Sequence, residues 1–69
     1  MLDNTNQILR LPKVKEMTGL SRSSIYAAVA KGLFPAPIHL SQRTVGWVRE
    51  EVQNWLDSRM AARQHKGVE

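Results

Sequence analysis

Hydrophobic residues recur every three or four positions in three separate stretches of this 69-residue chain. This spacing places them on one side of an α-helix, so each stretch predicts a helix with one face turned to a core. The predicted helices span about residues 12–18, 21–31 and 49–63. Their apolar positions are Leu11, Val14 and Met17 in the first, Ile25, Ala28 and Val29 in the second, and Val48, Val52, Trp55, Leu56 and Met60 in the third.

A glycine and a serine separate the first two predicted helices. Gly19 suits the left-handed backbone position that ends a helix, Leu20 offers an apolar plug, and Ser21 is a preferred N-cap residue. Gly32 is placed to end the second helix in the same way. Two helices joined by so short a turn predict a helix-turn-helix.

Two prolines interrupt the chain after the second predicted helix. Pro35 and Pro37 are incompatible with a helix interior, so residues 33–37 cannot continue the helix. We expect this segment to cross the domain in an extended form, with Leu33 or Phe34 in the core.

Alternating apolar and polar residues follow and predict a β-hairpin. Its two short strands are expected at 38–40 and 44–48, with a polar turn at 41–43. Because so small a hairpin is marginal alone, it must pack on the helices. Residues 8–11 form a further apolar run, expected as an extended segment against the core. The predicted fold class is mainly α with a small β-hairpin.

The length of the chain predicts one domain, over residues 8–63, between flexible tails at 1–7 and 64–69. The chain has no cysteine, so neither a disulfide nor a thiolate metal site is expected. Its first residues do not form a signal-peptide pattern, and no apolar run has the roughly 18 residues of a membrane span. We therefore expect a cytoplasmic protein without a membrane partner.

Basic residues outnumber acidic ones by ten to six, which gives a formal charge of +4. The excess lies mainly in residues 8–49, where Glu16 is the one acidic residue. Such a charge distribution suits a polyanionic partner such as nucleic acid, although many small soluble proteins are also basic.

The start of the second predicted helix carries the side chains that a DNA-reading helix needs. Arg22 can form a two-pronged hydrogen bond with guanine or bind a phosphate, and the free N–H groups of a helix start also suit phosphate. The alternative is that Ser21 only caps the helix and that Arg22 is merely solvated. The candidate DNA-binding residues of this helix are Ser21, Arg22, Ser23, Ser24, Tyr26 and Lys31.

The polar turn of the hairpin is a second candidate for DNA contact. An arginine on such a tip suits a narrow minor groove or the phosphates beside it, whereas the alternative is an ordinary solvated turn. The candidates there are Gln42, Arg43 and Thr44. Phosphate contacts are also expected at Arg10, Lys13 and Lys15, where they would position the protein without reading sequence. The alternative for these residues is a solvated face.

The sequence pattern gives no support to catalysis or metal binding. His39 and His65 lie far apart, with no further ligand at metal-binding spacing. There is no serine–histidine or paired-carboxylate arrangement and no glycine-rich phosphate loop. Phe34, Trp47 and Trp55 are expected in the core rather than stacked on bases. We expect neither an enzyme nor a cofactor, a metal site or a small-molecule ligand.

The ordered set of motifs resembles the AlpA family of small prophage-encoded transcriptional regulators, which are related to phage excisionases and to MerR-type winged-helix domains. The resemblance covers about residues 8–60 and depends on the order of the motifs rather than on any single one. The residues that carry it are Leu11-Pro12, Thr18 to Tyr26, Lys31-Gly32, Phe34-Pro35, Arg43, Val45-Gly46-Trp47, Glu51-Val52 and Trp55-Leu56.

The resemblance implies a winged helix-turn-helix with a two-stranded wing and a C-terminal amphipathic helix. In that arrangement the helix at about 21–31 enters the major groove, and the wing at about 38–48 touches the adjacent minor groove or backbone. The family's recognition and wing positions match Arg22, Ser23, Ser24, Tyr26 and Arg43. The chain departs from the family pattern after Tyr26, because short side chains at Ala27, Ala28 and Ala30 replace basic or long polar ones.

The leading hypothesis is a sequence-specific DNA-binding transcription regulator of prophage or mobile-element genes, acting in the cytoplasm on the bacterial nucleoid. Its partner would be double-stranded DNA, bound by monomers that associate cooperatively on repeated sites. One alternative is an excisionase-like architectural factor that bends DNA for a recombinase. A second alternative is a protein-interaction module that inhibits another regulator.

Overall fold

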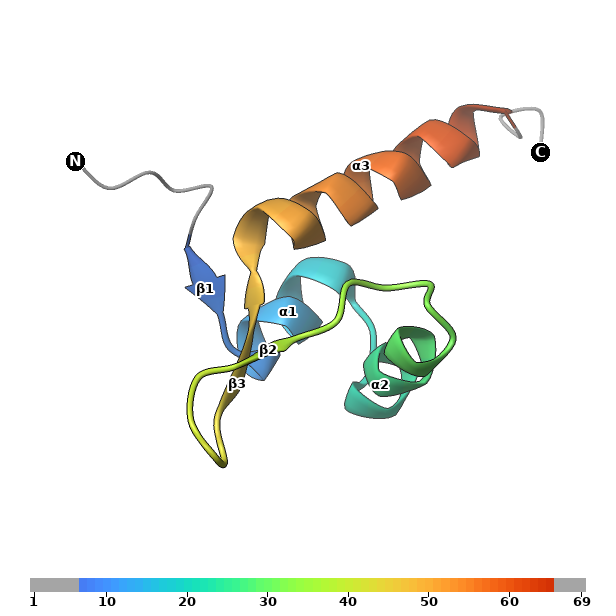
Figure 1. The fold of residues 1–69 in the computed structure, drawn as a ribbon. Coiled ribbons are helices and arrows are strands. Elements are labelled where there is room, and N and C mark those ends of the chain that lie inside the picture. The colour runs from blue at the N-terminus through green and yellow to red at the C-terminus, as the bar shows by residue number, and fades with distance from the viewer. Residues whose placement is uncertain (1–6, 66–69) are drawn as a thin grey trace.

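The structure of the protein, a computed structural model, describes residues 7–65 (Figure 1). In chain order its elements are β1 (Ile8–Leu9), α1 (Leu11–Thr18), α2 (Arg22–Ala30), β2 (Ile38–His39), β3 (Val45–Val48) and α3 (Arg49–His65). The predicted fold class, mainly α with a small β-hairpin, is confirmed. The predicted tails at 1–7 and 64–69 fall outside the described residues, apart from Gln7 and the last two residues of α3.

The sheet contains one more strand than the predicted hairpin. Its strand order is β1-β3-β2, with β3 in the centre and antiparallel to both neighbours. Residues 8–11 were expected only as an extended segment, but Ile8 pairs with Val48 and Leu9 pairs with Trp47. Two paired residues are too short a run for alternation to predict a strand or its partner. This pairing fixes the start of the domain beside the hairpin.

The hairpin turn is longer than the sequence predicts, because it spans residues 40–44 instead of 41–43. The backbone N–H groups of Leu40 and Ser41 both donate to the carbonyl oxygen of Thr44, at 2.7 and 3.2 Å. Leu40 and Thr44, which were expected at the strand ends, therefore belong to the turn. The two strands are shorter by one residue each.

The boundary between α1 and α2 forms as predicted. Gly19 has a φ of 75° and its N–H donates to the carbonyl oxygen of Lys15 at 2.8 Å, which ends α1. Ser21 is the N-cap of α2, because its side chain accepts a hydrogen bond from the Ser24 N–H at 3.1 Å. Gly32, with a φ of 73°, follows the end of α2. The left-handed conformation at both glycines is the one that residues with a Cβ rarely adopt.

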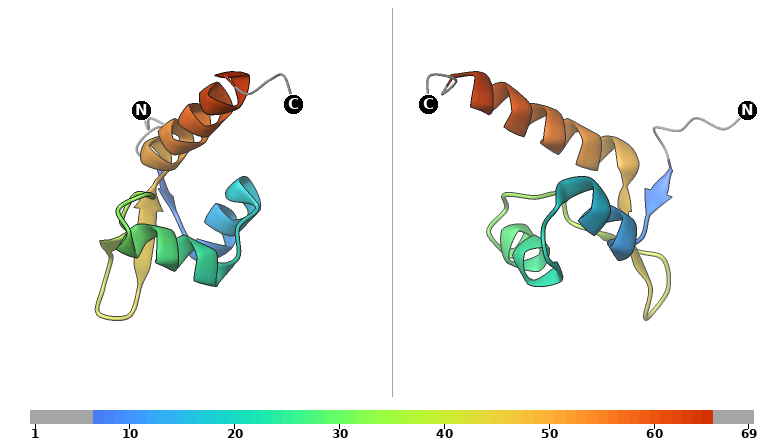
Figure 2. Two further views of the ribbon diagram at one scale, coloured as in Figure 1. Left: turned by 90° about the vertical axis from the view of Figure 1, so that its right-hand side faces the viewer. Right: turned by 180° about the vertical axis from the view of Figure 1, so that it is seen from behind.

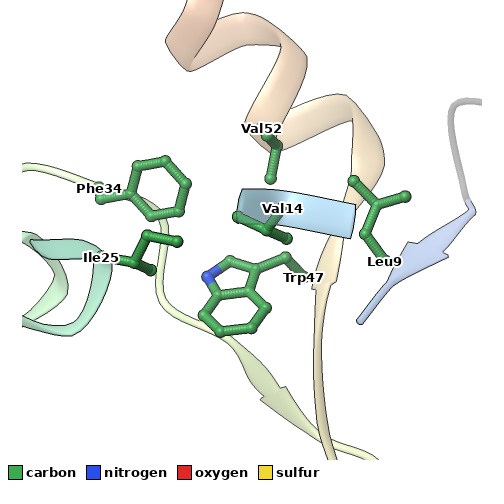
Figure 3. Packing of buried hydrophobic residues seen from close by; sticks show 6 residues of the cluster. All are labelled: Leu9, Val14, Ile25, Phe34, Trp47 and Val52. Atoms are coloured by element: carbon green, nitrogen blue, oxygen red, sulfur yellow. The ribbon is translucent and has the colours of Figure 1, made fainter. Parts of the chain in front are cut away.

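A cluster of buried side chains joins the elements of the described chain. Trp47 is fully buried, and its indole Nε1 donates to the carbonyl oxygen of Pro35 at 2.9 Å. Of the two residues of segment 33–37 that were candidates for the core, Phe34 is 4% exposed and Leu33 is 64% exposed. Figure 3 shows the cluster, which consists of Leu9, Val14, Ile25, Phe34, Trp47 and Val52.

The last helix extends beyond the rest of the domain (Figures 1 and 2). Val52 is buried near its start, and Trp55 and Leu56 pack against the core. The spacing also assigned Met60 to this apolar face, but Met60 is 49% exposed. That assignment is wrong because the helix continues past the point where the domain can cover it.

Replacing Gly46 by alanine is expected to destabilise the sheet. An added Cβ would collide with the Cγ2 atom of Ile8 and would lie 3.2 Å from the carbonyl oxygen of Leu9. Because the obstruction includes backbone, we expect a loss of about 1–3 kcal/mol in the free energy of unfolding. Urea unfolding followed by circular dichroism measures it.

An alanine at Ile8 provides the control for this effect. The Ile8→Ala change removes the colliding side-chain atom. Gly46→Ala should therefore lower the free energy of unfolding less in that background than in the parent chain. An unfolding midpoint that Gly46→Ala does not shift in the parent chain would contradict the packing described for β1 and β3.

Candidate nucleic-acid interface

The first turn of α2 presents three exposed side chains, those of Arg22, Ser23 and Ser24. Ser21 precedes them, and its hydroxyl accepts from the Ser24 N–H and donates to the Ser24 hydroxyl at 3.1 Å. The capping function predicted for Ser21 is confirmed. Ser21 and Ser24 thus stabilise the helix start, while Arg22 and Ser23 project from it.

Tyr26 lies one helical turn after Arg22 and has two aromatic contacts. The Cζ atom of Arg22 is 5.3 Å from the centroid of the Tyr26 ring. The same ring meets Trp47 at a centroid distance of 5.9 Å and an interplanar angle of 63°, an edge-on arrangement. Tyr26 is half-buried as a result. It connects the exposed arginine with the core.

The packing role of Tyr26 was not predicted from the sequence. The tyrosine was treated as a residue for DNA contact, because it follows the polar run at the helix start. One signal for its second role was present, since Tyr26 is four residues after Arg22 and three before Val29, on the edge of the apolar face.

The far end of α2 carries Lys31, the other candidate on this helix. Lys31 is the C-cap residue and is exposed, and its backbone N–H donates to the carbonyl oxygen of Ala27. Between the helix start and Lys31, Ala27 and Ala30 are exposed. Their short side chains leave this surface of the helix open to close approach.

The tip of the hairpin places Gln42 and Arg43 in solvent. Thr44 is half-buried, and its carbonyl oxygen accepts the hydrogen bonds that close the turn. Figures 1 and 2 show α2 and the hairpin tip on the side of the molecule that is turned away from α3. The structure therefore brings α2, which carries Arg22, and the hairpin tip, which carries Arg43, to one side of the molecule.

The three phosphate-contact candidates lie along α1 and are exposed, with Arg10 and Lys13 at the start of the helix and Lys15 in its last turn. Arg10 occupies the N-cap position, where its carbonyl oxygen accepts from the N–H groups of Lys13 and Val14. The Lys13 Nζ atom is 3.5 Å from a carboxylate oxygen of Glu16. Because exposed ion pairs of this kind contribute little, Lys13 can exchange Glu16 for a phosphate at small cost. Lys15 points from the exposed side of the same helix.

Among residues 7–65, no group of three or more histidine or acidic side chains could hold a metal ion. No helix in this part of the chain is long and apolar enough to cross a membrane.

A helix-turn-helix, an antiparallel hairpin and a closing helix together define a winged helix-turn-helix class of protein. Within that class the chain belongs to the AlpA family, because residues 7–60 match the family model described as prophage CP4-57 regulatory protein (AlpA). The resemblance inferred from the ordered motifs is confirmed.

Two relatives support this membership. The chain is 42% identical over 57 residues to the uncharacterized protein ORF88 of Enterobacteria phage P4, a match that covers 83% of this chain and 65% of the phage protein. It is 36% identical over 59 residues to the DNA-binding transcriptional activator AlpA of Escherichia coli strain K12. That second match covers 77% of this chain and 84% of the relative. The chain thus spans just under two thirds of the phage protein.

Proposed function

We propose that the protein is a sequence-specific DNA-binding transcription regulator of prophage genes. In this proposal α2 enters the major groove, and the hairpin of β2 and β3 touches the adjacent minor groove or the backbone. The proposal rests on two exposed arginines, Arg22 in α2 and Arg43 in the hairpin tip, whose elements lie on one side of the molecule. Such a regulator would act on chromosomal DNA in the bacterial cytoplasm.

Three further observations support DNA as the partner. The excess of basic residues, +4 for the chain, suits a polyanion. The start of α2 combines free backbone N–H groups with an arginine, which are the groups that bind phosphate and guanine. The E. coli relative is named as a DNA-binding transcriptional activator. In the present chain, short side chains at Ala27 and Ala30 leave Arg22 and Ser23 as the main groups for reading bases.

The salt dependence of DNA binding tests the proposed phosphate contacts. The candidate phosphate contacts are all exposed; they are Arg10, Lys13, Lys15, Arg22, Lys31 and Arg43. If about four to six of them neutralise phosphates, the logarithm of the affinity falls against the logarithm of salt concentration with a slope of about −4 to −5 per subunit. Fluorescence anisotropy with a short duplex at several salt concentrations measures the slope. A slope near zero would contradict the proposal.

Selection of bound genomic fragments identifies the DNA sequence that the protein recognises. Enrichment of a common motif near prophage promoters supports a transcription regulator. A permuted-site assay on the selected fragment then measures bending, and strong bending beside a recombination site would instead favour an excisionase-like factor. If the protein binds neither genomic nor random DNA even at low salt, a protein-interaction module is the better explanation.

A further inference from the structure

A line of side-chain contacts runs from the core to the guanidinium group of Arg22. Trp47 is fully buried and is fixed by the hydrogen bond from its Nε1 to the carbonyl oxygen of Pro35. The edge-on contact with Trp47 orients the ring of Tyr26, and that ring lies 5.3 Å from the Arg22 guanidinium carbon. Each side chain in this line is held by the one before it.

An exposed arginine normally samples many conformations. It loses this freedom when its guanidinium group forms a two-pronged contact, and the loss weakens binding. A guanidinium group over an aromatic ring is attracted by the ring and keeps fewer conformations. Arg22 is exposed at the start of α2, yet the Tyr26 ring limits it before any partner arrives.

We infer that Tyr26 is a positioning residue for DNA recognition, whose ring holds Arg22 in the direction needed to read a base. This inference rests on the proposed function. It assigns Tyr26 an action through Arg22, in place of a DNA contact of its own. The ring is suited to this role because its edge contact with Trp47 ties it to the core while Arg22 lies over it.

A double-mutant cycle tests the inference on the fragment that genomic selection provides. The measured quantity is the ratio of affinities for the selected duplex and for random DNA. Tyr26→Leu should lower this ratio roughly two- to fivefold, because the exposed pair with Arg22 is lost. Tyr26→Phe keeps the ring and should leave the ratio at the parent value, because the hydroxyl is not needed for the pair.

The Arg22→Ala background separates positioning from direct contact. If Tyr26 acts through Arg22, Tyr26→Leu should produce no further fall in the ratio once Arg22 has been replaced. An equal fall in both backgrounds would overturn the inference, because Tyr26 would then act independently of Arg22. A different result would contradict the proposed function itself, namely an Arg22→Ala variant whose ratio of affinities equals that of the parent.

A measurement on the parent protein avoids any dependence on how well the variants fold. In NMR spectra of the free protein, the side-chain protons of Arg22 should be shifted by the ring current of Tyr26. Arg43, an exposed arginine at the hairpin tip, provides the reference. Side-chain shifts of Arg22 that equal those of Arg43 would overturn the inference, and a distinct upfield shift would support it.

Discussion

The Trp47→Ala variant is expected to lose a large share of the stability of the domain. Trp47 is fully buried in the core, donates a hydrogen bond to Pro35, and contacts the ring of Tyr26. Truncating a buried tryptophan costs about 3–5 kcal/mol. A domain of 69 residues has a total stability of roughly 3–10 kcal/mol, so this one change removes a large share of it.

Circular dichroism during urea and thermal unfolding measures this effect. Trp47→Phe is the matched control, because it keeps an aromatic ring but loses the indole N–H and leaves the Pro35 carbonyl oxygen without that donor. We expect the phenylalanine variant to fold, with a loss of about 1–3 kcal/mol. If Trp47→Ala unfolds at nearly the same temperature as the parent, Trp47 is not the centre of the core.

Replacing Arg22 by alanine is expected to lower the affinity for the selected DNA by about ten- to a hundredfold, the discrimination that one good arginine–guanine pair provides. The affinity for random DNA should fall much less, because phosphate contacts from the other basic residues remain. Arg22 is exposed at the start of α2, so its loss should leave the fold intact. Anisotropy titrations with both duplexes, together with an unfolding curve, measure these quantities.

Arg63→Ala provides a control of equal charge. Arg63 is exposed near the end of α3, and α3 lies on the other side of the molecule from α2 and the hairpin tip. We expect this variant to keep the ratio between selected and random DNA. If the two arginine variants lose affinity equally, net charge rather than a reading contact at Arg22 explains the binding.

The positions of the helices could be predicted well from the sequence. Apolar spacing located α1, α2 and α3, and the cap residues Gly19 and Ser21 set the turn between the first two helices. These signals are local, since a cap or a helical face depends on residues within a few positions of one another. For the same reason the start of α2 could be chosen as a candidate interface before its geometry was known.

The features that the sequence did not reveal depend on contacts between distant residues. The pairing of Leu9 with Trp47 joins two segments that share no local pattern. Tyr26 is half-buried because it packs against Trp47. Trp47 lies in β3, which is separated from Tyr26 in the chain by the end of α2, the crossing segment and β2. Met60 continued a regular apolar spacing, but whether the domain reaches that far is a property of the folded chain.

The same distinction applies to the candidate site. Arg22 and Arg43 were both selected as exposed cations on separate elements, and the fold brings those elements to one side. The contact between Arg22 and Tyr26 was available from their spacing, whereas the support of Tyr26 by Trp47 was not. The exposed arginines could thus be predicted from the sequence, whereas the packing of Tyr26 against Trp47 is known only from the structure.

The proposed DNA-binding surface consists of α2 and the hairpin tip. The most direct measurement is an NMR titration of the isotope-labelled protein with the selected duplex, followed at each backbone amide. We expect the largest changes at residues 22–26 and 42–44, and small changes at residues 57–63 of α3. Changes concentrated at residues 57–63, with residues 22–26 unaffected, would contradict it.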